Sequence, residues 1–498
     1  MRKMGRKSLK TQKHKLNPLQ SGFFFKLNIT IFEKKKTHKM KKIVLLCFFC
    51  LLFMIAHAQD KASRIDSLLT AYSNQKVFNG NVLVAENGVV LFKKSYGYAD
   101  EETQRKLNPE TVFELASVSK QFTAMGIVLL QKQGKLSFDD PIKKYVPELS
   151  FYEGITIRNL LHHTGGLPDY MELFAEHWDK SKIAVNQDIV TLFAAHKPKA
   201  LFLPNEKYEY SNTGYALLGL IIEKVSKQSF GDYLKDAIFK PLQMNDTQVY
   251  RSRYQPEVIP NYANGYVLDE KNNKVKPDTF GKEFYSYYLD GIVGDGMVNS
   301  NLDDLLKWDR ALYGTQLVNE SDKQLIFSSI KTLDGKNTNY GFGWGISQHV
   351  KYGKSVSHTG SWAGYLTAIS RFLTEDKTII ILQNNLTQNT KIPIDEIKRI
   401  LYNESIVDKI ENKIALTTKD LDIYLGEYSS PEFPLKVTIT KDNVTMMAQA
   451  TGQSAFPLNA IAKDKFEFKR AGILLEFVPS EKKMILNQGG KQFVFTKS

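Results

Sequence analysis

A serine and a lysine three residues apart stand where an apolar helix is predicted to begin. Ser117 and Lys120 lie in TVFELASVSKQFTAMGIVLLQKQGKL, residues 111–136. Side chains at positions i and i+3 share one face of a helix, so the lysine amine can reach the serine hydroxyl and take its proton. The unpaired N–H groups at a helix start also favour the negative charge that develops when a carbonyl is attacked there. The pair predicts acyl transfer through serine.

The spacing alone is not distinctive. The same S-x-x-K pattern starts at Ser73, Ser328 and Ser480, and Ser117 has the alternative role of a helix N-cap with Lys120 solvated beside it. Only Ser117 precedes a helical stripe, which has apolar residues at 122, 125, 128 and 129 and a glycine at the expected C-cap, 134. This context favours the catalytic interpretation.

Two further polar clusters follow in the chain. The letters YSN at 210–212 precede an apolar helix predicted near 213–226, and HTG at 358–360 ends a predicted strand. Taken alone, the first cluster also fits an aromatic core residue beside a helix cap. A second HTG, at 163–165, is interpreted as a structural turn because it follows a helix end and precedes Leu-Pro. The clusters gain weight from their order along the chain.

The elements that must position these clusters divide into two domains. Residues 60–405 contain a hairpin with its turn at Asn87-Gly88, a helical middle, strands between about 338 and 385, and a helix near 392–402. Strands on both sides of a helical middle favour a sheet in which the first and last strands pair. From 417 to 498, LKVTIT, VTMMAQ, KFEFKR, ILLEFVP and QFVFTK predict a separate small all-β barrel. Aromatic residues near 250–290 either line the cleft or pack within loops, and loop packing is the favoured interpretation.

The basic character of the chain is confined to its beginning. The formal net charge is +14, but residues 1–42 hold fourteen of the lysines and arginines and a single acid, so the remainder is close to neutral. No nucleic-acid partner is therefore expected. Residues 1–39 lack periodicity and are interpreted as a non-native extension that precedes the true start at Met40.

Residues 40–58 have the pattern of a secretory signal peptide. Two lysines, an apolar run and the small-residue site Ala-His-Ala predict cleavage after Ala58 and a periplasmic or secreted protein. An uncleaved membrane anchor is the alternative, and membrane association is expected only in that case. Both cysteines, Cys47 and Cys50, lie in this segment, so the mature chain has no disulfide or cysteine ligand. We predict no metal and no cofactor.

The three motifs, in the order S-x-x-K, Y-x-N, H-T-G, resemble those of serine β-lactamases and penicillin-binding proteins, which carry S-x-x-K, S-D-N and K-T-G in this order. The tyrosine and histidine look like the class C β-lactamase and D-alanyl-D-alanine carboxypeptidase branch. Blocks such as ITIRNLLHHTGGLPDY and GDGMVNSNLDDLLKW extend the likeness over about 60–400. The resemblance implies an α+β, β-lactamase/transpeptidase-like fold: an antiparallel sheet flanked by helices plus a helical region. The tail is similar to lipocalin-like barrels.

The resemblance also implies a role for each residue. Ser117 is the nucleophile, Lys120 its activating partner, and Tyr210 the group that moves a proton to the leaving group. Which of Lys120 and Tyr210 is the acylation base stays open. The implied oxyanion hole is the backbone N–H of Ser117 and of Ser361. The implied substrate-binding residues are Asn212, His358, Thr359, Gly360 and Ser361.

His358 stands where the family's lysine variant anchors a substrate carboxylate. The contact is then weak or pH-dependent, so strong β-lactamase activity is not expected. We predict an exported serine hydrolase that forms an acyl-enzyme on Ser117 and acts on an amide or ester, as a carboxypeptidase, aminopeptidase or esterase. Its expected partners are small peptides with a D-residue, esters or β-lactams, and peptidoglycan fragments. The alternatives are a catalytically weak penicillin-binding or peptidoglycan-sensing protein, and a β-lactamase or esterase.

Overall fold

The computed structural model describes most of the chain as two compact units. The described residues are 59–387, 389–404, 417–431, 433–442, 444–451, 455–468, 472–488 and 491–497. The units divide after Asn403. The predicted extension at 1–39 and signal peptide at 40–58 lie outside the described residues. Within those residues, no helix has both the length and the apolar content needed to cross a bilayer.

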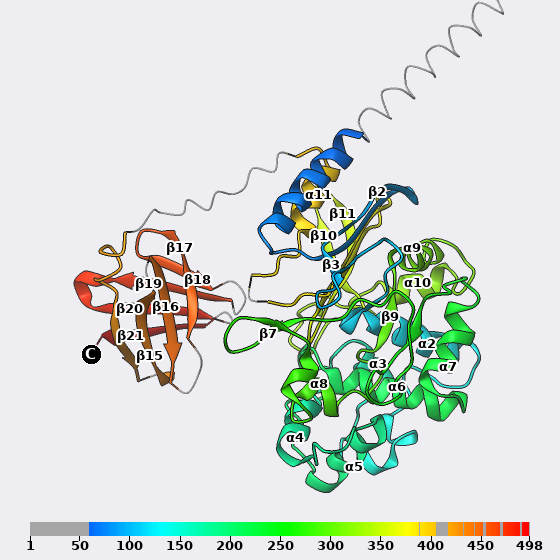
Figure 1. Ribbon diagram of the computed structural model, residues 1–498. Coiled ribbons are helices and arrows are strands. Elements are labelled where there is room, and N and C mark those ends of the chain that lie inside the picture. The colour runs from blue at the N-terminus through cyan, green and yellow to red at the C-terminus, as the bar shows by residue number, and fades with distance from the viewer. Residues whose placement is uncertain are drawn as a thin grey trace, which may run out of the picture. The chain divides into compact units, whose positions relative to one another are not determined.

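An antiparallel sheet forms the centre of the first unit (Figure 1). Its six strands lie in the order β10-β11-β12-β13-β1-β2. β1 pairs with β13 in the register Gly80↔Gln383, so strands from the two ends of the unit lie side by side. The bounds are β1 Gly80–Glu86, β2 Val89–Tyr96, β10 Gly345–His349, β11 Gly353–Trp362, β12 Tyr365–Phe372 and β13 Lys377–Gln383. The predicted pairing of first and last strands is confirmed.

The turn between β1 and β2 explains why this hairpin was readable in the sequence. Asn87 and Gly88 have φ values of 51° and 73°. Two consecutive residues with positive φ are typical of the type I′ turn, which matches the twist of paired strands and favours Asn-Gly.

Helices cover the sheet. Residues 59–74 form a helix that lies beside α11 (Ile394–Leu401) in Figure 1. The Tyr72 hydroxyl donates to Glu396 Oε1 at 3.2 Å and so joins these two helices. α11 directs Ile397, Ile400 and Leu401 into the core. The two ends of the first unit therefore meet in this helix pair as well as in the sheet.

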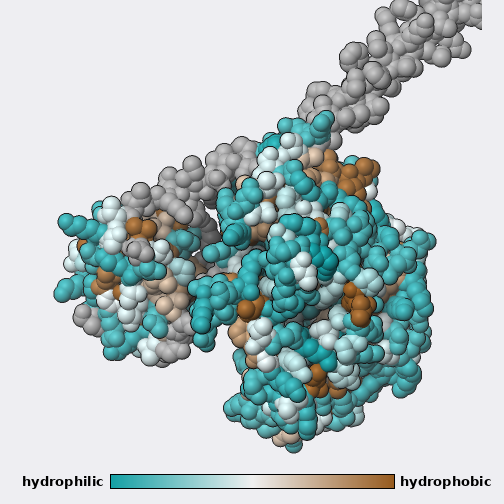
Figure 2. All heavy atoms as spheres, in the orientation of Figure 1, coloured by the Kyte–Doolittle hydropathy of each residue, from teal (hydrophilic) through white to brown (hydrophobic). Residues whose placement is uncertain are grey.

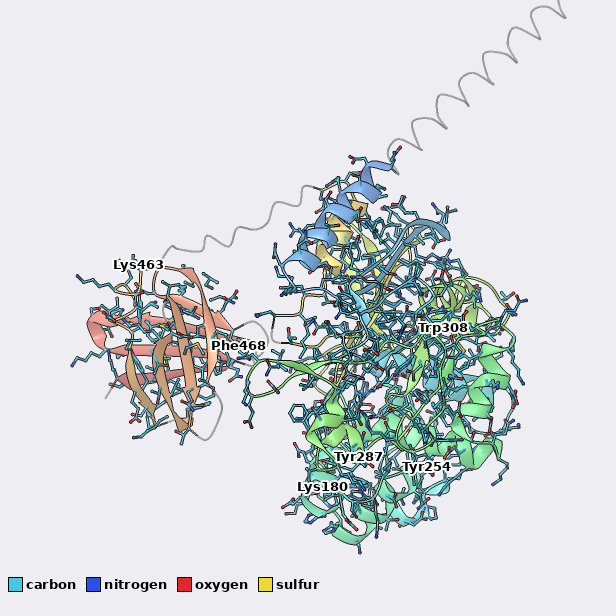
Figure 3. All side chains as sticks on the ribbon, viewed as in Figure 1. Lys180, Tyr254, Tyr287, Trp308, Lys463 and Phe468 are labelled. Carbon is cyan, nitrogen blue, oxygen red and sulfur yellow. The ribbon has the colours of Figure 1, made fainter. Side chains whose placement is uncertain are left out.

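The helical region lies between β2 and β10 in the chain. α2 (Lys120–Lys132) is its central helix, because nearly every side chain along it is buried, which is typical of a helix inside a core. Trp308 on α9, labelled in Figure 3, donates its indole N–H to Gln121 of α2 at 2.9 Å. The other helices are α3 Ile157–Leu161, α4 Tyr170–His177, α5 Asn186–His196, α6 Asn212–Ser226, α7 Phe230–Leu234, α8 Tyr285–Tyr288, α9 Leu302–Ala311 and α10 Glu320–Ile326.

Short strands outside the main sheet form small sheets of their own. β9 (Val298–Ser300) pairs with both β5 (Phe113–Glu114) and β6 (Gln248–Val249). Two further pairs are β3 (Tyr98–Asp100) with β4 (Arg105–Lys106), and β7 (Val267–Leu268) with β8 (Lys274–Val275). β5 matters most for the site, because it ends three residues before Ser117.

The second unit is a closed barrel of strands β14 to β21. Tyr428, Ile439, Met446, Phe466 and Phe495 are among the side chains that fill it. The predicted α+β domain followed by a small all-β barrel is thus confirmed. Three strands were not expected, and β17 shows why, since Pro457 argues against a strand in sequence. The bounds are β14 Gly426–Ser430, β15 Phe433–Asp442, β16 Thr445–Ala450, β17 Phe456–Ala462, β18 Lys465–Phe468, β19 Ile473–Val478, β20 Lys483–Gln488 and β21 Lys491–Lys497.

The visible surface is largely hydrophilic. On the face shown in Figure 2, hydrophobic residues occur in small, separate patches. Scattered apolar residues of this kind are normal on a folded protein and do not mark an interface. On this face, no hydrophobic patch among the described residues is large enough to indicate a binding surface.

Candidate active site

Ser117 lies in a tight turn that leads into α2. The 3₁₀ turn η1 spans Ala116–Ser119, and α2 follows directly at Lys120. Ala116 has a φ of 49°, in the left-handed region that costs a non-glycine residue roughly 1–2 kcal/mol. Leu115 is held on both sides: its N–H donates to Val298 O at 2.9 Å, and its carbonyl accepts from Thr367 Oγ1 at 2.6 Å. The surrounding strands thus hold the serine on a strained turn.

Lys120 is fully buried and contacts Ser117 directly. Its Nζ lies 3.2 Å from Ser117 Oγ, 3.0 Å from Asn212 Oδ1 and 2.8 Å from the Asp295 carbonyl oxygen. The Asn212 and Asp295 oxygens can only accept, so they take two N–H groups of Lys120. The third direction faces Ser117 Oγ, where a neutral amine would accept the serine proton. The geometry is that of a base in contact with its nucleophile.

Tyr210 and Asn212 reach the same point from the start of α6. Ser211 is the N-cap, and its hydroxyl accepts from the Gly214 N–H at 3.1 Å, which places Asn212 in the first turn. The Tyr210 ring is 40% exposed, and Lys120 Nζ lies 5.0 Å from its centroid. An exposed phenol beside the lysine can exchange protons with both the site and solvent.

His163 packs against Tyr210. The two ring centroids lie 4.4 Å apart, and the Ser211 N–H donates to His163 Nδ1 at 3.0 Å. Burial and the charge of Lys120 hold the pKa of His163 well below its usual value, so this ring stays neutral. The second HTG does form a turn, since His163 has a φ of 56°. It also supports the tyrosine, which the sequence did not indicate.

Both ring nitrogens of His358 bond within the protein, so they are not available to anchor a substrate. Its Nδ1 lies 2.7 Å from the Thr359 carbonyl, which can only accept, so Nε2, 2.8 Å from the Tyr340 hydroxyl, is the acceptor. Burial, helped by the charge of Lys120, lowers the pKa of His358 to about 3. A neutral His358 offers a substrate carboxylate no charge near neutral pH, which agrees with the expectation of a weak contact. His358 acts as a neutral link between Tyr340 and β11.

The rest of β11 runs along the nucleophile turn, which is the 3₁₀ turn Ala116–Ser119 that contains Ser117. A Cβ on Gly360 would lie 2.2 Å from the Leu115 carbonyl oxygen and 3.0 Å from the Ser117 nitrogen. Only glycine allows this approach. Thr359 and Ser361 are exposed, and Ser361 lines the same pocket as Ser117. The strand therefore lies against the turn that contains Ser117 and places Ser361 at the same pocket.

The pocket next to Ser117 has a volume of about 240 Å³. Asn212, Ser361 and Trp362 line it, together with residues that the sequence did not single out: Glu114, Tyr170, Tyr285 and Asp295. The Tyr170 hydroxyl donates to Asp295 Oδ2 at 3.0 Å. Tyr285 comes from the aromatic stretch near 250–290 that was interpreted as loop packing. Among the described residues, no cluster of histidine and acidic side chains is suited to hold a metal ion.

Most of the first unit matches a known protein family. Residues 65–403 match the family described as Beta-lactamase. The chain belongs to the beta-lactamase family. Penicillin-binding protein 4* of Bacillus subtilis (strain 168) is 38% identical over 446 residues, which cover 87% of this chain and 98% of that protein. The resemblance inferred from the three motifs is thus confirmed.

Two solved structures are similar to this chain in fold. The octameric penicillin-binding protein homologue from Pyrococcus abyssi is 25% identical, covering 87% of this chain and 99% of that one, with a TM-score of 0.62. The D-amino acid amidase from Ochrobactrum anthropi SV3, complexed with D-phenylalanine, is 23% identical, covering 69% and 99%, with a TM-score of 0.58. The second likeness supports the fold alone.

The structure brings together the residues that the sequence singled out, while their roles stay predictions. Hydrogen bonds join Ser117, Lys120 and Asn212, and the Lys120 amine lies over the Tyr210 ring. Strand β11 supplies residues 358–361. His163, Glu114 and Asp295 were missed as site residues. His163 had one signal, its duplicate of the third motif. Glu114 and Asp295 had none, because single acids occur throughout the chain.

Proposed function

We propose that the protein is an exported serine hydrolase that forms an acyl-enzyme on Ser117 and hydrolyses an amide or ester. The observation that carries this proposal is the triple contact of Lys120 Nζ with Ser117, Asn212 and Asp295 beside the pocket. A serine hydroxyl is a weak nucleophile until a neighbouring base takes its proton. Membership of the beta-lactamase family supports the same chemistry.

In the first half of the reaction, Ser117 Oγ attacks the substrate carbonyl carbon while its proton moves to Lys120 or Tyr210. The backbone N–H groups of Ser117 and Ser361 stabilise the oxyanion. The tetrahedral species collapses, the bond to the leaving group breaks, and Tyr210 gives that group a proton. An amine or alcohol departs, and an ester to Ser117 remains.

In the second half, water replaces the leaving group. Tyr210, which solvent reaches, takes a proton from the attacking water. The new tetrahedral species releases a carboxylic acid and returns the proton to Ser117. Rapid turnover requires this second step. A protein that acylates but deacylates slowly would instead be a penicillin-binding or sensing protein.

The substrate class follows from the site and the relatives together. We expect a small peptide or amide with a D-residue, as in peptidoglycan stem peptides, which an exported enzyme would meet. The neutral, internally bonded His358 offers no fixed cation to a substrate carboxylate. Efficient hydrolysis of β-lactams, which carry such a carboxylate, is therefore not part of the proposal.

The test is intact-mass spectrometry after incubation with a fluorophosphonate probe. We expect a single adduct on the wild-type protein and none on Ser117→Ala. Ser73→Ala is the matched control, since Ser73 also begins an S-x-x-K sequence, and it should still be labelled. Labelling of Ser117→Ala at the wild-type level, or no labelling of the wild type, overturns the proposal.

A further inference from the structure

The pocket beside Ser117 is acidic. Two carboxylate residues, Glu114 and Asp295, line it, and none of the described lining residues is lysine, arginine or histidine. Lys120 is fully buried and directs its amine to Ser117, Asn212 and the Asp295 carbonyl instead. The remaining wall is largely apolar, with Met171, Tyr285, Leu289, Ile292, Met297 and Trp362. A ligand in this pocket meets two carboxyl groups within an apolar surface.

Glu114 reaches the pocket because of its place in β5. Phe113 is fully buried, and alternation along a strand turns the next side chain to the other face. β9 holds this strand in place through the pair Glu114↔Asn299. The Glu114 side chain thus comes from a fixed backbone, three residues before the nucleophile, and does not depend on a loop.

The Glu114 carboxylate has no hydrogen-bond or ion-pair partner in the part of the chain that the structure describes. Arg253 is the cation whose charge opposes a rise in the pKa of Glu114. Its guanidinium already donates to Asp278 at 2.6 Å and 2.9 Å and to Asp290 at 3.0 Å. Burial and the charge of Asp290 raise the pKa of Glu114 to about 8, against the opposing effect of Arg253. The phenols of Tyr262, Tyr285 and Tyr365 also face it and carry no charge near neutral pH. Glu114 is therefore largely protonated near neutral pH in the free protein, and a positive charge placed beside it would lower its pKa and stabilise the carboxylate.

Asp295 adds a second carboxyl group at the same wall. Its Oδ2 accepts from the Tyr170 hydroxyl, which leaves further lone pairs on the carboxylate. Burial raises the pKa of Asp295, while Lys120 and Tyr170 oppose that rise. Unlike Glu114, Asp295 already has partners on both its backbone and its side chain. Glu114 is therefore the carboxyl group in this pocket that can still accept hydrogen bonds from a ligand.

We propose that this pocket selects substrates whose acyl part carries a protonated amine, and that the Glu114 carboxylate binds this ammonium group beside Ser117. The inference rests on the proposed function, and it narrows the substrates to amino-acid amides, amino-acid esters and peptides cleaved after a free N-terminal residue. The same acidic wall disfavours acyl parts that carry a carboxylate. Glu114 is then a specificity residue, because it contacts the substrate but not the reacting bond.

Steady-state hydrolysis of matched substrates tests the proposal. D-phenylalanine p-nitroanilide is compared with its N-acetyl derivative, which lacks the positive charge. We expect the wild type to favour the free amine in kcat/KM. Glu114→Gln, which keeps the size of the side chain, should reduce this preference by on the order of 10- to 100-fold, mainly through KM, as expected for loss of a charged hydrogen bond. Glu283→Gln, at an exposed glutamate, is the matched control.

A second measurement separates this inference from the proposed function. Binding of D-phenylalanine amide and of 3-phenylpropanamide, which lacks the amine, is measured by calorimetry on Ser117→Ala with and without Glu114→Gln. We expect tighter binding of the amine, and loss of that difference in the double variant, whether or not Ser117 is reactive. Equal affinities for the two amides in Ser117→Ala, or an equal fall for both in the double variant, overturn the inference. Absence of probe labelling in the wild type overturns the proposed function instead.

Discussion

His163 and Tyr210 pack ring against ring, with centroids 4.4 Å apart and planes inclined by 36°. His163 also accepts the N–H of Ser211, the residue that caps α6. One buried imidazole therefore fixes both the tyrosine and the start of the helix that carries Asn212. Since the His163 ring is neutral, its influence on the site comes from packing and hydrogen bonding and not from charge.

His163→Asn should slow labelling of Ser117 by a fluorophosphonate about 10-fold, equivalent to about 1.4 kcal/mol. Asparagine tolerates the positive φ of this position and has an acceptor for the Ser211 N–H, but it leaves the Tyr210 ring without support. The labelling rate is followed by intact-mass spectrometry. His196→Asn, at an exposed histidine, is the control. A wild-type rate in His163→Asn would show that the ring contact does not matter.

Gly360→Ala should abolish labelling of Ser117 or slow it by more than about 100-fold, equivalent to about 2.7 kcal/mol. The new Cβ would lie 2.2 Å from the Leu115 carbonyl oxygen, so either β11 or the nucleophile turn must move. Gly314→Ala is the matched control, because the nearest atom to its Cβ would be 3.7 Å away. Unchanged labelling of Gly360→Ala would mean that β11 or the turn can shift without affecting the labelling of Ser117.

Ala116→Gly should raise the free energy of unfolding by about 0.5 kcal/mol, because glycine adopts positive φ without steric cost. The gain is partly offset by the greater freedom of glycine in the unfolded chain. Urea denaturation followed by circular dichroism measures the change. Ala124→Gly, inside α2, should have the opposite sign and cost about 1 kcal/mol or more. If both substitutions destabilise equally, the left-handed turn at Ala116 stores no strain.

His162 should make the protein less stable in acid. Burial lowers its pKa to about 4, whereas an unfolded histidine has a pKa near 6.5. Between these values the unfolded state binds the extra proton, so stability falls as the pH drops from about 6.5 to 4. From pH 7 to pH 5, the free energy of unfolding of the wild type should fall by about 2 kcal/mol relative to His162→Phe. His196→Phe is the surface control, and parallel pH profiles for wild type and His162→Phe would contradict the prediction.

Local patterns carried most of what the sequence revealed. The contact of Ser117 with Lys120 follows from helix geometry, the β1–β2 hairpin from Asn87-Gly88, and the sheet from the order of strands around a helical middle. The partners of His358 and His163 could not be predicted, since they depend on Tyr340 and Tyr210, which only the tertiary fold brings near. Glu114 was equally hidden, because a two-residue strand has no periodicity that reveals which way its acid points.

The residues that hold the nucleophile turn in place lie far along the chain from it, so they are synthesised late. Thr367, whose hydroxyl holds the Leu115 carbonyl, is made 252 residues after Leu115. Gly360, which fits against the same carbonyl, is made only slightly earlier. A growing chain that already contains Ser117 and Lys120 therefore lacks the two residues that shape their turn. We therefore expect fragments that end before β11 to show no labelling of Ser117.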